Sequence, residues 1–307
     1  MKATIIHNPA AGQNDSGQRL RRIVADLESQ GWRISMRETT PRMSAQKLAE
    51  QARDDGAQVV VAAGGDGTIN GVVNGLVNSE VVLGILPTGT ANVWAQESGL
   101  NNPSPLGDNL EHAARVLLEG NRLRLDLGKA GDRHFLLMAG IGLDGIVTER
   151  VDKRVKARFG ALAYAWTAVR EAFRYRGAVA TIILDDREIT RRIWLLTVSN
   201  SKNYARVPLA TDASVTDGLL NVGIFEGSSW RRYLRHLVSV MLRRHKGEPN
   251  VEFHTAKQIE INTIPQLPVH VDAEPMGYTP MRFEVVPSAL TVIVPSKSAE
   301  KLSKPLD

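Results

Sequence analysis

The feature that most constrains this chain is an uninterrupted apolar run, Val59–Ala63, that ends directly in Gly64-Gly65-Asp66-Gly67. A continuous β-branched run is typical of a strand buried on both faces, as in a parallel sheet. Glycines at the end of such a strand permit positive φ angles and let the backbone approach a ligand closely. The pattern then predicts a helix over Gly67–Val77. This junction favours an α/β fold.

The first 125 residues repeat the same alternation of strand and helix. Strands separated by helices of this length imply a parallel sheet with helices on both faces. We expect strands at Ala3–His7, Trp32–Glu38, Gln58–Ala63 and Val82–Leu86, and helices at Ser16–Gln30, Ser44–Arg53, Gly67–Val77, Ala91–Glu97 and Leu110–Leu118.

After about Leu123 the pattern changes to short β-rich runs separated by turn residues. Such runs predict an antiparallel sandwich or barrel. Two helical segments, roughly Val151–Tyr175 and Ser229–Arg244, interrupt them. The length of 307 residues suits two domains or one large one. We place an α/β domain at residues 1–123 and a β-sandwich domain at residues 124–289.

Composition excludes several classes of site and location. The chain has no cysteine, so disulfides, thiolate metal sites and a cysteine nucleophile are excluded. No apolar stretch reaches the roughly 20 residues that cross a bilayer, and the N-terminal run breaks at His7 before it resembles a signal peptide. We therefore expect a cytoplasmic protein that is at most peripheral to a membrane.

The basic excess belongs to the second half of the chain. Residues 1–125 hold 12 Lys/Arg and 13 Asp/Glu, and the remainder holds 26 and 20. Segments 150–176 and 230–246 combine basic residues with apolar residues at helical spacing, a pattern that can lie on the anionic inner face of a membrane. The alternative is that the apolar stripe packs on the sandwich while the charges are solvated. We do not expect nucleic acid as a partner, because the sequence contains no known DNA- or RNA-binding motif.

Three loops are expected at one edge of the parallel sheet: Asn8–Gly12, Gly64–Asn70 and Leu86–Asn92. Ligands of open α/β sheets bind outside the carboxyl ends of the strands, and a helix N-terminus there suits phosphate. Asp66 would repel phosphate, so it indicates a Mg²⁺ ion or a positioning role. The alternative is a structural turn that Asp66 caps. Neither a Walker loop nor GxGxxG is present.

These loops resemble the catalytic domain shared by diacylglycerol kinases, sphingosine kinases and bacterial lipid kinases. The similar segments are NPAAG at 8–12, GGDGTINGVVNGL at 64–76, LPTGTANVWA at 86–95, AGIGLDG at 139–145, DASVTDGLLNV at 212–222 and Asp272-Ala273-Glu274. Their order and spacing agree with the family over about residues 3–295.

The resemblance implies an ATP-dependent lipid kinase with its active site in a cleft between a nucleotide domain and a β-sandwich. The last segment, about 290–307, would pack on the first domain. The catalytic residues would be Glu274 as general base, Asp66 and Asp272. Mg²⁺ would take the Asp217 carboxylate and the backbone carbonyls of Ser214 and Leu219. ATP would contact Asn8, Thr39, Gly64, Gly65, Asp66, Gly67, Thr68, Asn70 and Thr90.

The chain departs from the family pattern at three positions. Val93 follows Asn92 where the family has Asp, Gly71 stands at a family Glu, and Ala273 replaces the middle Gly of Asp-Gly-Glu. These changes leave the metal network and the choice of lipid open. Asp217-Gly218 can alternatively be interpreted as an ordinary hairpin turn. Glu274 can alternatively be interpreted as a surface residue of a turn.

Three functions are compatible with the sequence. A kinase for a diacylglycerol-like or sphingoid-like lipid leads, because phosphoryl transfer needs positioning loops, Mg²⁺ and a base near the acceptor hydroxyl. An NAD kinase-like enzyme and a non-catalytic nucleotide or lipid sensor are the alternatives. The acceptor lipid stays open, as does the formation of a homodimer.

Overall fold

The computed structural model describes residues 1–11, 16–101, 108–150, 166–167, 170–171, 174–204, 207–210, 212–227, 248 and 250–303. Contacts divide the chain into two compact units. The first unit comprises Met1–Leu127, Ser214–Gly218 and Val286–Asp307, and the second comprises Gly128–Ala213 and Leu219–Val285.

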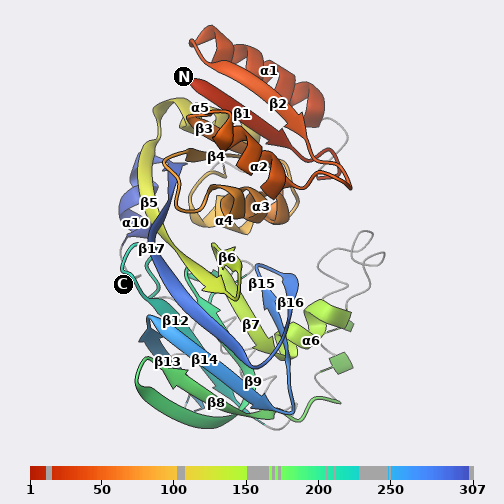
Figure 1. Ribbon diagram of the computed structural model, residues 1–307, viewed down its shortest axis with the longest axis vertical. Coiled ribbons are helices and arrows are strands. Elements are labelled where there is room, and N and C mark those ends of the chain that lie inside the picture. Colours follow the sequence, from red (N-terminus) through yellow and green to blue (C-terminus); the bar gives the residue numbers. More distant parts are fainter. Residues whose placement is uncertain are drawn as a thin grey trace. The chain divides into compact units, whose positions relative to one another are not determined.

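The first unit is built on a parallel sheet whose strands are β1 (Lys2–His7), β2 (Arg33–Glu38), β3 (Val59–Gly64) and β4 (Val82–Pro87) (Figure 1). Their order is β2-β1-β3-β4, and each neighbouring pair is parallel. The last part of β17 (Met281–Val294) adds a further parallel strand, with Thr291 opposite Val82. The α/β fold predicted for this part of the chain is confirmed.

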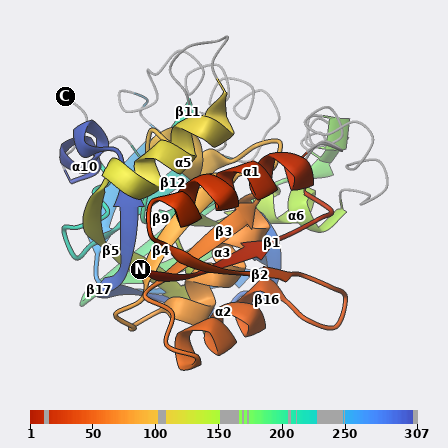
Figure 2. The same cartoon turned by 90° about the horizontal axis from the view of Figure 1, so that it is seen from above.

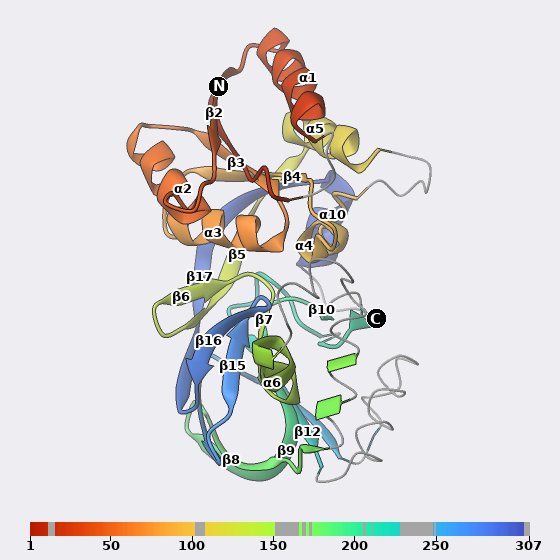
Figure 3. The same ribbon diagram turned by 90° about the vertical axis from the view of Figure 1, so that its right-hand side faces the viewer.

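Helices cover both faces of this sheet. Figures 2 and 3 show α1 (Ser16–Ser29) and α5 (Asn109–Glu119) on one face, and α2 (Ala45–Asp54) and α3 (Asp66–Leu76) on the other. Helices α2 and α3 pack so closely at Gly71 that a Cβ added there would lie 2.9 Å from Ala45 Cβ. The glycine that replaces the family's Glu therefore has a packing reason. Two further helices are α4 (Val93–Glu97) and α10 (Ser296–Leu302).

The second unit is an antiparallel β-sandwich, as predicted. Its core joins side chains from facing strands, among them Val198, Val222, Ile182 and Phe283. The strands are β6 (Arg133–Phe135), β7 (Met138–Gly142), β8 (Ala178–Leu184), β9 (Arg187–Ser199), β12 (Leu220–Glu226), β13 (Val251–Ala256), β14 (Gln258–Ile264), β15 (Pro268–Val271) and β16 (Glu274–Tyr278), with two-residue strands β10 (Asn203–Tyr204) and β11 (Val207–Pro208).

Strand β9 takes part in both sheets of the sandwich. Its first half pairs with β8, and its second half lies between β7 and β12. The pairing with β12 shifts register at Phe225/Glu226, and such a bulge bends a strand. Helix α6 (Leu143–Arg150) follows β7, and β5 (Asn121–Ala130) and β17 each contribute residues to both units.

Most of the two basic segments lies outside the described residues, including 151–165 and 228–247. Of the residues described there, Trp166 is 74% exposed, and the Arg150 guanidinium lies 2.5 Å from the buried Glu171 carboxylate. Across the described part of the chain, none of the helices combines the length and the apolar character needed to cross a membrane.

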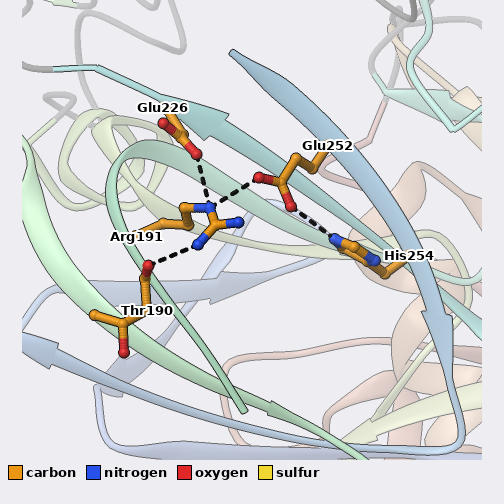
Figure 4. Close-up of polar contacts among 5 residues, drawn as sticks. All are labelled: Thr190, Arg191, Glu226, Glu252 and His254. Atoms are coloured by element: carbon orange, nitrogen blue, oxygen red, sulfur yellow. Dashed lines mark hydrogen bonds and ion pairs between the residues drawn. The ribbon is translucent and has the colours of Figure 1, made fainter. Parts of the chain in front are cut away.

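A polar network joins three strands of the second unit (Figure 4). Arg191 Nε on β9 lies 2.8 Å from both Glu226 Oε1 on β12 and Glu252 Oε1 on β13. The second oxygen of Glu252 lies 3.0 Å from His254 Nε2. Burial by itself raises the pKa of Glu252, but hydrogen bonds from Arg191 and His254 outweigh it, so the pKa lies below the ordinary value of 4.5.

We expect this network to make stability depend on pH at the acid end. Because the folded-state pKa of Glu252 is lowered, the unfolded chain binds more protons as pH falls below 4.5, and the ion pair's contribution is lost there. We therefore expect the free energy of unfolding, measured with denaturant from acid to neutral pH, to fall less in acid for Glu252→Gln than for the unaltered chain. The difference should stay under about 1 kcal/mol, since the pair is partly exposed. Identical acid profiles would contradict the prediction.

Candidate active site

The glycine loop presents an uncapped helix N-terminus. Gly65 is the N-cap of α3, with φ −94° and ψ −174°, and it supplies no side-chain acceptor to the first turn. The N–H groups of Thr68 and Ile69 donate to Gly65 O at 2.9 and 3.0 Å. The N–H groups ahead of Thr68 and the positive end of the helix dipole suit an anion such as phosphate.

The loop after β4 lies directly against the glycine loop. The N–H groups of Thr88 and Gly89 both donate to Gly64 O, each at 3.2 Å. A Cβ built on Gly89 would lie 2.5 Å from Gly65 Cα. The backbones of the two loops therefore approach as closely as only glycine allows.

The loop after β1 joins the same edge of the sheet. Asn8 N–H donates to Ala63 O at 3.0 Å, and Asn8 Nδ2 donates to Thr68 Oγ1 at 3.1 Å. Thr39 N–H donates to His7 O at 2.9 Å, which places Thr39 beside this loop. The convergence of three loops that the sequence predicts is therefore present within the first unit.

The predicted nucleotide residues do not all lie at this edge in the same way. Gly67 is exposed in the first turn of α3, and Thr90 is exposed on the loop after β4. Asn70 is buried one turn into α3, where its side-chain oxygen lies 3.2 Å from Asn74 Nδ2. Of the predicted ATP-contacting residues, Asn70 is therefore the one whose side chain the structure turns to a partner within its own helix.

The Asp66 carboxylate is directed at the N-terminus of α4. Its Oδ1 lies 3.5 Å from the backbone N–H of Trp94. Burial raises the pKa of Asp66, while backbone N–H groups of Trp94, Val93 and Asn92 act in the opposite direction. The contact ties the glycine loop to the loop after β4.

Two buried polar atoms beside these loops suit a bound polar ligand. Thr88 Oγ1 and Asn92 Oδ1 have no hydrogen-bond partner among the described residues. Asn92 adopts the left-handed conformation, with φ 47°, and its Nδ2 donates to Gly89 O at 2.6 Å. Buried polar atoms normally find partners, so a hydroxyl that can donate or accept and an amide oxygen that accepts fit a nucleotide here. The sequence analysis did not single out either atom.

Two of the three predicted metal residues, Ser214 and Asp217, belong to the first unit, and the third, Leu219, belongs to the second. Residues Ser214–Gly218 contact Asp126, a carboxylate that is 3% exposed and that the sequence analysis did not select. Asp126 accepts from Gly218 N–H and from Ser288 N–H, both at 2.7 Å, and its own N–H donates to Val215 O. Asp126 therefore shapes the turn that carries Asp217.

Asp217 itself is exposed on this turn. Among the described residues no group of three His, Asp or Glu side chains could hold a metal ion. A single carboxylate beside backbone carbonyls is still an all-oxygen donor set, of the kind to which Mg²⁺ adds several waters. The residues present therefore fit Mg²⁺ in kind.

In the second unit Asp272 is a buried carboxylate that accepts three backbone hydrogen bonds. Its oxygens accept from the N–H groups of Leu136, Leu137 and Met138 at 3.0 to 3.1 Å. Asp272 and Ala273 have φ angles of 47° and 63° and form the tight turn between β15 and β16. Positive φ at both central positions is typical of a type I′ hairpin turn. Asp272 thereby holds the turn against the strand that follows β6.

Glu274 is the first residue of β16. Its side chain is 45% exposed, and its Oε2 accepts a hydrogen bond from Arg133 on β6. Glu274 is therefore reachable from solvent, whereas the carboxylate of Asp272 is surrounded by backbone.

A buried pair lies next to this hairpin. His270 Nε2 on β15 lies 2.5 Å from Asp144 Oδ2 on α6. Gly140 makes room for the pair, because a Cβ there would fall within 2.3 Å of both side chains. Burial lowers the pKa of His270, but the charge and hydrogen bond of Asp144 outweigh it, so the net direction is up.

Two family models match almost the whole chain. The model of the diacylglycerol kinase catalytic domain matches residues 2–130, and that of the YegS C-terminal NAD kinase beta sandwich-like domain matches residues 138–294. The chain belongs to the diacylglycerol kinase catalytic-domain family. The resemblance that the three loops and the Asp272–Glu274 segment indicate is thus confirmed.

Relatives of this family match over nearly their full length. The diacylglycerol kinase of Bacillus subtilis (strain 168) is 28% identical over 305 residues, which cover 98% of this chain and 99% of that protein. The diacylglycerol kinase of Staphylococcus aureus (strain MRSA252) is 28% identical over 299 residues, covering 96% and 93%. The crystal structure of a diacylglycerol kinase from Bacillus anthracis str. Sterne is 24% identical, covers 95% and 96%, and superposes with a TM-score of 0.78.

Substitution of Gly89 tests the contact between the two glycine loops. In Gly89→Ala the new Cβ would lie 2.5 Å from Gly65 Cα, so one loop must shift. We expect ATP binding, measured by calorimetry, to weaken by roughly tenfold, or about 1.4 kcal/mol. Gly17→Ala is the matched control, because nothing lies within 4 Å of its Cβ. Equal ATP affinity in both variants would refute the role of the contact.

Substitution of Ala273 tests the strain in the hairpin turn. Ala273 has φ 63°, a conformation that glycine adopts without a Cβ clash. We expect Ala273→Gly to raise the free energy of unfolding by about 0.5–1 kcal/mol. The same change within helix α10, Ala299→Gly, should lower it by about 1 kcal/mol. Denaturant unfolding decides, and destabilisation by both changes would mean that the turn is not strained.

Proposed function

We propose that this chain is an ATP-dependent lipid kinase that transfers the γ-phosphate of ATP to a hydroxyl of a diacylglycerol-like or sphingoid-like lipid. The observation that carries the proposal is the uncapped N-terminus of α3, which two neighbouring loops flank in a member of this family. Relatives with the same family models are named diacylglycerol kinase, and one from Chromohalobacter salexigens, 29% identical over 285 residues, is named "Probable lipid kinase YegS-like".

ATP is proposed to bind with its phosphates at the glycine loop. The N–H groups at the start of α3 would face phosphate oxygens, and Asn8, Thr39 and Thr90 would line the same edge. Thr88 Oγ1 and Asn92 Oδ1, which lack partners among the described residues, would hydrogen-bond to the nucleotide or its waters. Asp66 would act by holding the two loops together.

Mg²⁺ is proposed to bind the Asp217 carboxylate with the backbone carbonyls of Ser214 and Leu219. When bound, the ion supplies positive charge against the phosphates, which phosphoryl transfer requires. Asp126 would act in support, because its hydrogen bonds to the N–H groups of Gly218 and Ser288 shape the turn.

Glu274 is proposed as the general base. Its carboxylate takes the proton of the lipid hydroxyl as the new O–P bond forms and the bond from Pγ to the bridging oxygen of ADP breaks. The proton later leaves Glu274 for solvent. Asp272 would contribute as a positioning residue, since its carboxylate is occupied by three backbone N–H groups.

A lipid acceptor requires contact with a bilayer, so we also propose peripheral binding of a cytoplasmic protein at the inner membrane face. The exposed Trp166 and the basic residues near it support this contact. Aromatic and basic side chains on one amphipathic segment are the usual means of interfacial binding.

Substitution of the proposed base tests the function. We expect Glu274→Gln to lower transfer of label from γ-labelled ATP into diacylglycerol mixed micelles by roughly 100-fold or more, because the amide cannot accept the proton. ATP affinity, measured separately, should not change. Glu284→Gln is the control, since Glu284 is a half-exposed, ion-paired glutamate of the same unit that has no assigned role.

Three outcomes are distinguishable. Loss of transfer in Glu274→Gln alone supports the proposal. Normal turnover of that variant would show that Glu274 is not the base. A lack of label from the unaltered chain, with ATP still bound, would contradict lipid kinase activity towards that acceptor class.

A further inference from the structure

The proposed base is in contact with a cation from another hairpin. Arg133 Nη2 donates to Glu274 Oε2, and the two side chains are 28% and 45% exposed. Arg133 opens β6, directly after the turn at Gly131-Asp132 that ends β5. Nothing in the sequence pattern points to this arginine.

The contact is one of several between the same two segments. Residues 136–138 donate three backbone hydrogen bonds to Asp272, two positions before Glu274. Residues 133–138 thus hold the turn between β15 and β16 at two points. They contact Asp272 on its buried side and Glu274 on its exposed side. A hairpin held in this way has a defined backbone position at Glu274.

The backbone alone does not fix the carboxylate of Glu274. In the described part of the sheet, β16 lies at the edge and pairs with β15, in a register that shifts at Val269/His270. A half-exposed glutamate has several rotamers, and ordering such a side chain costs entropy. A guanidinium fork matches carboxylate geometry and restricts these rotamers better than a single point charge does.

Charge gives a second reason for an arginine here. The proposed reaction brings the Glu274 carboxylate close to a hydroxyl that attacks a phosphate, so two anionic groups must approach each other. Like charges at such distances repel, and a cation in contact with one of them offsets the repulsion. Arg133 is in contact with Glu274.

We infer that Arg133 is a positioning residue for the general base, an inference that rests on the proposed function. It holds the ionised carboxylate of Glu274 in one orientation for the lipid hydroxyl. When the proton moves from the hydroxyl to Glu274, the carboxyl group becomes neutral, and the γ-phosphoryl group moves from ATP to the lipid oxygen with ADP as the leaving group. Release of that proton to solvent restores the ion pair.

A purely structural ion pair would behave differently. Partly exposed pairs contribute about 1 kcal/mol or less to stability, so their loss should barely change folding. The β5–β6 hairpin, which carries Arg133, offers a matched pair whose glutamate has no assigned role: Lys129 on β5 lies 2.8 Å from Glu284 on β17. Both ion pairs join the β5–β6 hairpin to a glutamate on another strand. Of the two glutamates, only Glu274 is the proposed base.

The experiment compares Arg133→Gln, Arg133→Lys and Lys129→Gln with the unaltered full-length chain. Steady-state kinetics with ATP and diacylglycerol mixed micelles give kcat and both KM values, and thermal unfolding gives stability. We expect Arg133→Gln to lower kcat by roughly 10- to 100-fold with both KM values unchanged, as for a misplaced catalytic group. Arg133→Lys should recover part of kcat, because it keeps the charge and loses the fork. Lys129→Gln should leave kcat unchanged.

A double variant separates positioning from a general defect. Adding Arg133→Gln to Glu274→Gln should cause no further loss of kcat, because groups that act as a unit are not additive. Unchanged kcat in Arg133→Gln, an equal loss in Lys129→Gln, or a full further loss in the double variant would each overturn the inference while lipid kinase activity stands. Failure of the unaltered chain to phosphorylate the lipid would overturn the proposed function and this inference with it.

Discussion

Two hydrogen bonds onto one carbonyl oxygen, Gly64 O, set the geometry on which the nucleotide edge depends. The N–H groups of Thr88 and Gly89 both reach it at 3.2 Å, and this draws the loop after β4 against the start of α3. The contact requires glycine at position 89, because a Cβ there would lie 2.5 Å from Gly65 Cα. With the loops joined in this way, Asp66 can span from α3 to the N-terminus of α4, and the start of α3 has no side-chain cap at Gly65, which suits an anion.

Several aspartates of the chain use their carboxylates to hold backbone, and three of them lie in the segments that carry the proposed sites. Asp66 faces the start of α4, Asp126 binds the N–H groups of Gly218 and Ser288, and Asp272 binds three successive N–H groups before and at the start of β7. Each therefore joins segments that are distant in sequence. Asp217 is exposed and the Glu274 side chain is 45% exposed, and we propose these two carboxylates as the metal ligand and the base.

The sequence predicts the regular parts of the fold well. Strands β1 to β4 lie within one residue of their predicted ends, because the runs of β1, β3 and β4 are mostly apolar, that of β2 alternates, and all four end at glycine, proline or polar residues. The three loops at one sheet edge follow from the parallel topology, and the family motifs locate Asp272 and Glu274. The role of Asp126 could not be predicted, since its partner Ser288 is 162 residues away. The place of Ser214–Gly218 in the first unit and the contact of Arg133 with Glu274 could not be predicted either. Contacts between residues that are distant in sequence leave no periodic pattern in the local sequence.

The measurement that tests the account most directly is transfer of γ-labelled phosphate, with ATP and Mg²⁺, into a panel of mixed micelles. The panel holds diacylglycerol, monoacylglycerol, sphingosine, ceramide and phosphatidylglycerol, with NAD as a soluble acceptor. The account predicts label in a lipid and none in NAD, and the labelled lipid names the acceptor. Label in NAD alone would contradict it, because the glycine loops would then serve a different phosphoryl transfer.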